Sequence, residues 1–255
     1  MTPSTTTTTT TTAATPPVPP AGPRAATAPT GGRAALLLLA DGRFPAGGHA
    51  HSGGAEAAVK AGRIRDAATL EDFCRGRLHT AGLVAGALAA AGALGIDPAE
   101  LDAAADARTP APALRTTARR LGRQLTRAAR SVWPGDPGLE ALAAAYPRGA
   151  HQPVVLGLAA RAAGLGPLDA AHVAAYESTG GPATATVRLL GLDPFEATAV
   201  LARLTPELDE VAERATAAAH RARRAGTGAL PAASSPLLEI GAQAHAAWPV
   251  RLFAS

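Results

Sequence analysis

The residues best suited to chemistry lie in one short stretch, Phe44–Glu56, which reads FPAGGHAHSGGAE. It contains two histidines, His49 and His51, with a hydroxyl at Ser52 and a carboxylate at Glu56. Two imidazoles so close together on a loop could jointly ligate a nickel or zinc ion. A serine beside a histidine could also act as a nucleophile if the fold supplied a base.

Neither kind of site is complete in the sequence. A zinc site usually takes three or four protein ligands, and the chain has one cysteine, Cys74, far from the two histidines. The alternatives for His49 and His51 are therefore hydrogen bonding within the loop, contact with a partner, or transient contact with a metal. The sequence around Ser52 lacks the Gly-x-Ser-x-Gly pattern of a nucleophile elbow. Lys60 is the sole lysine and no phosphate-binding loop surrounds it, so the chain is not itself a P-loop GTPase.

The elements that must position these residues are two helices and a shaped loop. The apolar run Leu36–Leu39 precedes Pro45, and two glycine pairs, Gly47-Gly48 and Gly53-Gly54, enclose the histidines. Glycine allows positive φ and proline fixes φ, so the stretch is predicted to be a loop. Ser52 or Gly53 is expected to cap a following helix. We call residues 44–56 the elbow.

Composition predicts an all-α fold. Alanine and leucine, which favour helices, dominate, and aromatic residues make up only 3% of the 255 residues. We expect a single compact multi-helix domain at residues 33–255, preceded by a disordered tail rich in Thr, Pro and Ala at residues 1–32. The apolar run Ala81–Ile96 is too short and too rich in alanine and glycine for a membrane span, so it is expected to be a buried helix. One cysteine fits a reducing cytoplasm.

Several helix boundaries can be predicted from capping residues. Asp97-Pro98, Asp136-Pro137 and Asp193-Pro194 each combine a capping carboxylate with a proline suited to the first turn. Thr69 with Asp72 resembles a capping box, and Thr205-Pro206 is expected to kink a helix or restart it.

The segment Leu114–Val132 is predicted to be an amphipathic helix with a stripe of arginines. Six arginines fall within roughly 140° of arc at 100° per residue: Arg115, Arg119, Arg120, Arg123, Arg127 and Arg130. Three interpretations are open: a solvated face, a docking face for an acidic protein surface, or a nucleic-acid-binding face. The third is the least favoured, because no aromatic residues alternate with the arginines, and the net charge of +4 is small.

Three blocks of the sequence resemble, in order, the UreF family of urease accessory proteins. The first is LLLLADGRFPAGGHAHSGGAEAAVKAGRIRD around the elbow, the second lies in His151–Leu190, and the third is the ending SSPLLEIGAQAHAAWPVRLFAS. The resemblance covers Ala35–Ser255. It implies an all-helical, non-catalytic scaffold without a cofactor, often a homodimer, that acts in the cytoplasm and binds neither nucleic acid nor membrane.

The resemblance also implies partners. They are a UreD- or UreH-type accessory protein, the GTPase UreG and apo-urease, with GTP hydrolysis coupled to nickel insertion. Residues 231–255, above all Trp248, Arg251, Leu252 and Phe253, are expected to bind the UreD-type partner. His49, His51, Ser52 and Glu56, with Arg188, are expected near a dimer or GTPase-facing surface. Two rival hypotheses are a small helical enzyme built around His49, His51 and Ser52, and a nucleic-acid-binding helical domain using the arginine stripe.

Overall fold

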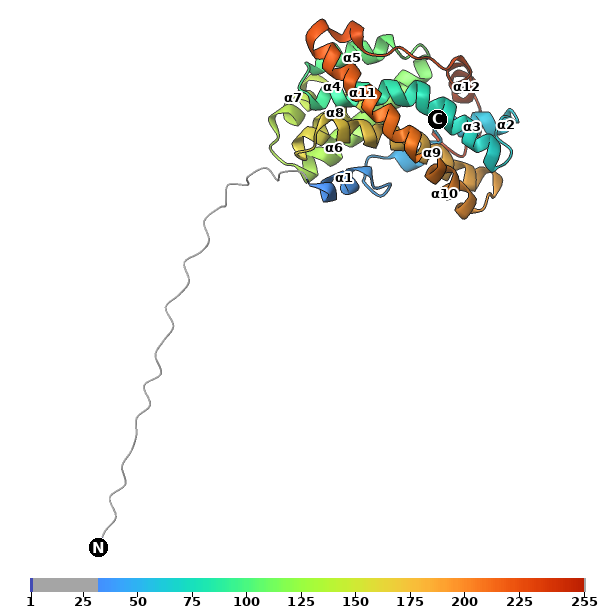
Figure 1. Ribbon diagram of the computed structural model, residues 1–255, viewed down its shortest axis with the longest axis horizontal. Helices are drawn as coiled ribbons and strands as arrows, with labels where there is room; N and C mark the ends of the chain where they lie inside the picture. Colours follow the sequence, from blue (N-terminus) through green and yellow to red (C-terminus); the bar gives the residue numbers. More distant parts are fainter. Residues whose placement is uncertain (2–31, 255) are drawn as a thin grey trace.

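The computed structural model describes Met1 and residues 32–254. The predicted disordered tail, residues 1–32, falls almost entirely on residues 2–31, which lie outside the described residues. From residue 32 onward the chain is a body of helices (Figure 1), and the described part contains no strand. The all-α prediction is therefore confirmed. Within residues 32–254 no helix combines the length and the apolar character needed to span a bilayer.

The elements follow one another through short connections. In chain order they are α1 (Arg33–Ala40), η1 (Gly48–Ala50), α2 (Ala55–Lys60), α3 (Ala67–Arg77), η2 (Leu78–Gly82), α4 (Leu83–Ala93), α5 (Pro98–Ala107), α6 (Pro112–Val132), α7 (Pro137–Ala145), α8 (Gln152–Ala162), α9 (Pro167–Leu190), α10 (Pro194–Arg203), α11 (Thr205–Ala225), η3 (Thr227–Ala229) and α12 (Pro236–Ala246).

Most of the predicted helix starts are confirmed. Asp97, Asp136 and Asp193 each cap a helix whose first residue is proline, and each carboxylate accepts a backbone N–H of the first turn. The capping box at Thr69 and Asp72 is wrong: Asp66 caps α3, and Thr69 is the third helical residue of that box. The competing signal was Asp66 itself: its carboxylate accepts the backbone N–H of Thr69, and the Thr69 hydroxyl accepts the backbone N–H of Asp66, so the helix begins three residues earlier. Thr205 restarts the chain as α11.

The core is built around α4, which the apolar run Ala81–Ile96 predicted as a buried helix. Glycines let neighbouring helices approach it closely: a Cβ built on Gly157 of α8 would lie 2.3 Å from the Ala89 carbonyl oxygen. One on Gly86 would lie 3.2 Å from Ala215 Cβ in α11. Figure 1 shows α11 crossing over α4, with α8 and α9 beneath. An interior of alanines and glycines packs well only at such short distances between helices.

The π-helical turn between α3 and α4 was not predicted. Leu78–Gly82 form a π-helical turn, so α3, η2 and α4 run on continuously. His79 in this turn places Nε2 2.8 Å from Glu207 Oε2 of α11. Gly82 packs beside α9, where a Cβ would lie 2.7 Å from Ser178 Oγ. The extra residue of the π turn thus fits the helix to two neighbours at once.

Candidate partner-binding site

The elbow is a structured loop, as predicted. Gly47 and Gly54 have φ of 80° and 92°, values that favour glycine. Gly54, and not Ser52 or Gly53, is the N-cap residue of α2, while Ser52 Oγ accepts the backbone N–H of Glu56 at 3.3 Å. A Cβ on Gly54 would lie 2.4 Å from Leu238 Cδ1 of α12. The elbow therefore packs directly against the C-terminal helix.

Glu56 fastens the end of the chain. Its Oε1 accepts the backbone N–H of Leu252 at 2.8 Å, and its Oε2 accepts that of Phe253 at 3.0 Å. The same Oε2 lies 2.8 Å from Nε2 of His245 in α12. We call Glu56 with residues 245–254 the C-terminal clasp. Because one carboxylate holds three groups, the last turn of α12 and the extended terminus are fixed relative to α2.

The electrostatics of the clasp follow from its geometry. Burial favours a raised pKa for the Glu56 carboxyl, but the hydrogen bonds from Leu252, His245 and Phe253 outweigh it and hold the pKa below its usual value. Glu56 is 8% exposed and His245 is 2% exposed. A buried carboxylate that accepts several hydrogen bonds is stable as the anion. Glu56 therefore accepts these hydrogen bonds as a carboxylate anion at neutral pH.

Ring contacts and one backbone bond complete the clasp. Lys60 Nζ lies 3.9 Å from the centre of the Trp248 ring, and the Trp248 and His245 rings meet edge to face at 4.8 Å. On the other side, Arg188 Cζ lies 5.3 Å from the centre of the Phe253 ring. The N–H of Ala254 donates to the carbonyl oxygen of Ala50 at 2.8 Å. The terminus thus lies between α2, α9 and the elbow.

The clasp leaves apolar side chains facing solvent. Val250 and Leu252 are 81% and 73% exposed, and Leu237 and Ile240 of α12 are 61% and 66% exposed. The buried face of α12 is formed by other residues, Leu238, Ala242 and His245. Exposed apolar residues on a segment held in place by hydrogen bonds are typical of a protein contact surface.

The structure brings the two predicted groups of contact residues into one region. His49 and Arg188 are exposed near the clasp, and Arg251 and Leu252 are exposed on it. Trp248 is half-buried. Four other predicted contact residues are buried inside the chain, where they support this surface: His51, Ser52, Glu56 and Phe253. Contact of any of these residues with a partner stays a prediction.

Sequence reasoning missed the bond between Glu56 and the terminus. Leu252 lies 196 positions away, and the bond runs to backbone N–H groups, which any residue carries. The available signals were the unusually apolar terminus and a glutamate two residues after Gly54, and neither one points to the other. Such a pairing is a property of the tertiary fold.

The histidine and serine chemistry finds little support. Burial, and next the charges of Arg120 and His49, lower the pKa of His51 to about 4, so its imidazole is neutral at pH 7. Among the residues that the structure describes, no group of three or more His, Cys, Asp or Glu side chains could hold a metal ion. Ser52 is fully buried, so a substrate does not reach its hydroxyl in this conformation.

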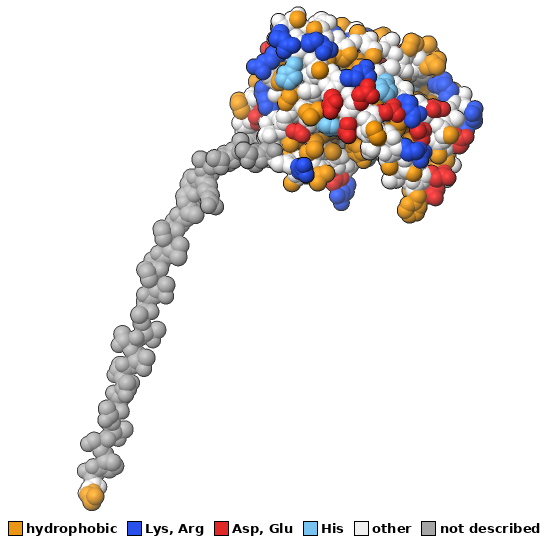
Figure 2. Space-filling model, in the orientation of Figure 1, with side chains coloured by type: hydrophobic (Ala, Val, Ile, Leu, Met, Phe, Trp, Pro, Cys, Tyr) orange, Lys and Arg blue, Asp and Glu red, His pale blue; other side chains and the backbone are white. Residues whose placement is uncertain are grey.

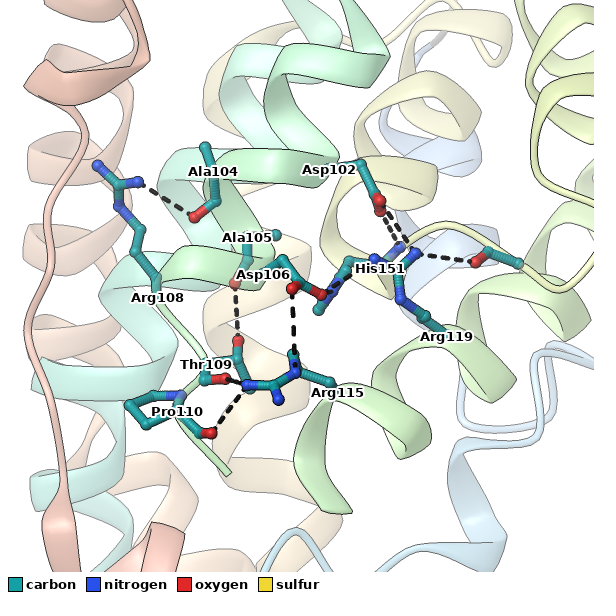
Figure 3. Close-up of polar contacts among 11 residues, drawn as sticks. Asp102, Ala104, Ala105, Asp106, Arg108, Thr109, Pro110, Arg115, Arg119 and His151 are labelled. Atoms are coloured by element: carbon teal, nitrogen blue, oxygen red, sulfur yellow. Dashed lines mark hydrogen bonds and ion pairs between the residues drawn. The ribbon is translucent and has the colours of Figure 1, made fainter. Parts of the chain in front are cut away.

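A second histidine network ties α5, α6 and α8 together (Figure 3). His151 Nε2 lies 3.1 Å from Asp106 Oδ1, and the His151 backbone N–H donates to Asp102 Oδ1 at 2.7 Å. Arg119 donates to Asp102 at 2.9 Å and to Asp106 at 3.0 Å. The Thr109 hydroxyl donates to the carbonyl oxygen of Ala105 at 2.9 Å. The network therefore serves to join helices.

The fold and site define an all-α protein with a fastened, apolar C-terminal segment, and comparison with known proteins identifies its family. Residues 64–205 match the UreF family model. The chain is 43% identical over 221 residues to a urease accessory protein UreF of Mycobacterium sp. strain JLS, covering 86% of this chain and 97% of the relative. The UreF of Mycolicibacterium vanbaalenii is 42% identical over 226 residues, covering 87% and 98%.

A third relative, the UreF of Mycobacterium tuberculosis, is 43% identical over 215 residues, which are 83% of this chain and 93% of the relative. Similarity of this extent, over nearly the whole of each relative, establishes the family. The chain belongs to the UreF family of urease accessory proteins.

Proposed function

We propose that this chain is a non-catalytic scaffold in urease maturation. Together with a UreD- or UreH-type accessory protein it recruits the GTPase UreG to apo-urease, where GTP hydrolysis is coupled to nickel insertion. Family membership supports the urease context. The observation that carries the scaffold role is the C-terminal clasp, in which a buried carboxylate fixes a segment with Val250 and Leu252 exposed.

The clasp gives the UreD-type partner a preformed binding surface. A segment already held by Glu56 loses less conformational entropy on binding than a free one, so more of the contact energy appears as affinity. The exposed Val250 and Leu252 supply apolar area for the contact, and Trp248 and Arg251 beside them are of the residue types enriched in interface centres.

The neighbouring elbow and Arg188 form the second proposed contact surface, for UreG or for a second copy of this chain. His49 and Arg188 are its exposed members. Because Arg188 also contacts the Phe253 ring of the clasp, a partner on the clasp would affect the surface offered to UreG. Assembly in this order, UreD-type protein first, is the arrangement we propose.

The test uses the full chain with Val250 and Leu252 both changed to aspartate. Removing residues 231–255 would also uncover buried groups, so point substitutions on exposed side chains are cleaner. Affinity for the purified UreD-type partner should fall about 100-fold or more, with unchanged thermal unfolding. Phe195→Asp is the matched control, since Phe195 is an exposed apolar residue, at 83%, on α10.

A second readout is activation of apo-urease in a mixture containing the UreD-type protein, UreG, GTP and nickel. The double variant should lose activation in proportion to the loss of binding, and Phe195→Asp should retain both. Unchanged co-purification of the double variant with the UreD-type partner would contradict the proposal.

A further inference from the structure

The arginine stripe predicted on α6 divides into two sets of three. Arg115, Arg119 and Arg130 turn to carboxylates of this chain: Arg119 pairs with Asp102 and Asp106, Arg115 approaches Asp106 at 3.9 Å, and Arg130 pairs with Glu140. Figure 3 shows Arg115 and Arg119 directed into the network around His151. The other three arginines, Arg120, Arg123 and Arg127, are exposed, and no carboxylate of a described residue forms an ion pair with them.

These three arginines share one side of α6 with a fourth. At 100° per residue, Arg120, Arg123 and Arg127 fall within about 60° of arc. Arg148 comes from the loop between α7 and α8, where a Cβ on Gly149 would lie 2.9 Å from Arg123 Cβ. That loop therefore runs against α6, and the exposed Arg148 belongs to the same surface. We call Arg120, Arg123, Arg127 and Arg148 the arginine strip.

The strip differs from the charged surface elsewhere. Over α3 and α11, acidic and basic side chains gather together (Figure 2), and Arg75 and Arg203 both pair with Glu71. On the strip, Arg123 and Arg127 are a like-charged pair at i,i+4, which costs a few tenths of a kcal/mol in an isolated helix. Positive charge that no carboxylate of a described residue neutralises in an ion pair makes a field that attracts an acidic surface.

The strip is continuous with the C-terminal clasp through the elbow. Gly47 lies against Gln124 of α6, in the middle of the strip, with no room for a Cβ beside Gln124 Oε1. At the other end of the elbow, Ala50 accepts the N–H of Ala254. Arg120 is also close enough to His51 for its charge to lower the His51 pKa. A partner seated on the clasp would therefore reach the strip across a few residues.

We infer that the arginine strip is a docking site for an acidic helix or loop of the partner that binds the C-terminal clasp. This inference rests on the proposed function. The chain's own residues 2–31 contain no Asp or Glu, so they lack the negative charge that an occupant of the strip needs. Nucleic acid is the poorer fit, since Trp133 is half-buried against Phe44 and no exposed aromatic ring accompanies the arginines to stack on bases.

The expected contribution is mainly to the association rate. Exposed charges in a complementary field steer the encounter, and their effect falls with salt because the Debye length shortens. The apolar clasp, in contrast, is expected to set the dissociation rate. The two surfaces can be separated by kinetics for this reason.

The experiment measures binding of the full chain to the purified UreD-type partner at low and high salt. The variant carries Arg120→Glu, Arg123→Glu and Arg127→Glu, and the control carries Arg221→Glu, Arg223→Glu and Arg224→Glu. The control changes the net charge equally on exposed residues at the end of α11. The strip variant should associate about tenfold or more slowly at low salt, the difference closing at high salt, with the dissociation rate nearly unchanged. The association rate of the control variant at low salt should stay within about threefold of the wild-type rate. Thermal unfolding is followed for both variants, because acidic residues at the end of α11 oppose the helix dipole.

Four other outcomes would contradict the assignment of the arginine strip as a docking site for this partner. If the wild type binds and the Val250 and Leu252 variant weakens binding while the strip variant does not, the strip is no docking site and the proposed function stands. If the wild type does not bind the UreD-type protein, the proposed function is wrong, and the inference about the strip, which rests on it, is wrong as well. Stronger loss of binding to a duplex DNA probe than to the protein would assign the strip to nucleic acid. A change from dimer to monomer in sedimentation would assign it to a second copy.

Discussion

The interior around α4 and the C-terminal clasp are held together by opposite means. Around α4, glycines and alanines let the helices approach closely. A Cβ added at Gly157, for example, would meet the backbone of Ala89. The clasp depends on the single carboxylate of Glu56 and leaves Val250 and Leu252 in solvent. The comparison indicates that the stability of the fold comes mainly from close packing between helices. The surface available for contacts lies instead on a segment that is held by hydrogen bonds to Glu56. A disruptive substitution in the interior around α4 should therefore lower the stability of the whole fold, whereas one in the clasp should loosen only the C-terminal segment.

The largest effect is expected from Gly157→Ala. The new Cβ would lie 2.3 Å from the Ala89 carbonyl oxygen and 2.9 Å from Gly92 Cα, both backbone atoms that cannot turn away. We expect a loss of about 3 kcal/mol in the free energy of unfolding, measured by urea denaturation. The whole helical signal should shift together, because α4 and α8 belong to the same core.

Gly76→Ala is the matched control for this change. Gly76 lies in α3 with nothing within 4 Å of a built Cβ. The substitution should be neutral or stabilise the protein by up to about 1 kcal/mol, through helix propensity alone. Equal stability of the two variants would show that α4 and α8 do not approach each other this closely.

A smaller and local effect is expected from Glu56→Gln. The amide cannot accept on its nitrogen, so at least one of the groups at Leu252, Phe253 and His245 loses its partner. Opening of the terminus should become about 100-fold more frequent, which corresponds to the loss of one or two charge-assisted bonds. Hydrogen exchange at the Leu252 and Phe253 amides measures it, while the urea midpoint should move less than in Gly157→Ala.

Glu239→Gln gives the control for this prediction. Glu239 also lies on α12, but its Oε2 accepts the N–H of Ala111 at 2.7 Å, on the side facing α6. Exchange at Leu252 and Phe253 should then stay at the wild-type rate. If both variants loosen the terminus equally, the clasp has no special dependence on Glu56.

Acid should act like Glu56→Gln. The folded-state pKa of Glu56 lies below its usual value, so the clasp's contribution to stability is complete above the unfolded pKa of about 4.3. It is lost as pH falls through the lower folded value, because the unfolded state then binds the proton more tightly. Trp248 fluorescence in a Trp133→Phe background should report this release, and the Glu56→Gln variant should lack it.

The same contrast explains what could be predicted from sequence. Helix starts such as Asp97-Pro98 depend on residues a few positions apart, and composition alone indicates an all-α chain. The close approach of helices to α4 was also predictable, because a buried helix of alanine and glycine has only small side chains and fills its surroundings only if its neighbours come near. The particular neighbours were not predictable. The clasp was not predictable either, since Glu56 bonds backbone N–H groups almost two hundred positions away. The division of the arginine stripe depended in the same way on where α5 places Asp102 and Asp106.

The smallest effect is expected from Arg188→Gln. Arg188 Cζ lies 5.3 Å from the centre of the Phe253 ring, and the side chain is exposed, so the cation–π contact is worth about 0.5 kcal/mol. Opening at the Phe253 amide should rise about twofold, while Arg251→Gln, at an exposed position of the same segment, should change it less. If Arg188→Gln loosens the terminus as much as Glu56→Gln, then α9 shares the fastening and the clasp does not rest on one carboxylate. A loss of UreG recruitment without any loosening would instead place Arg188 in direct contact with the GTPase.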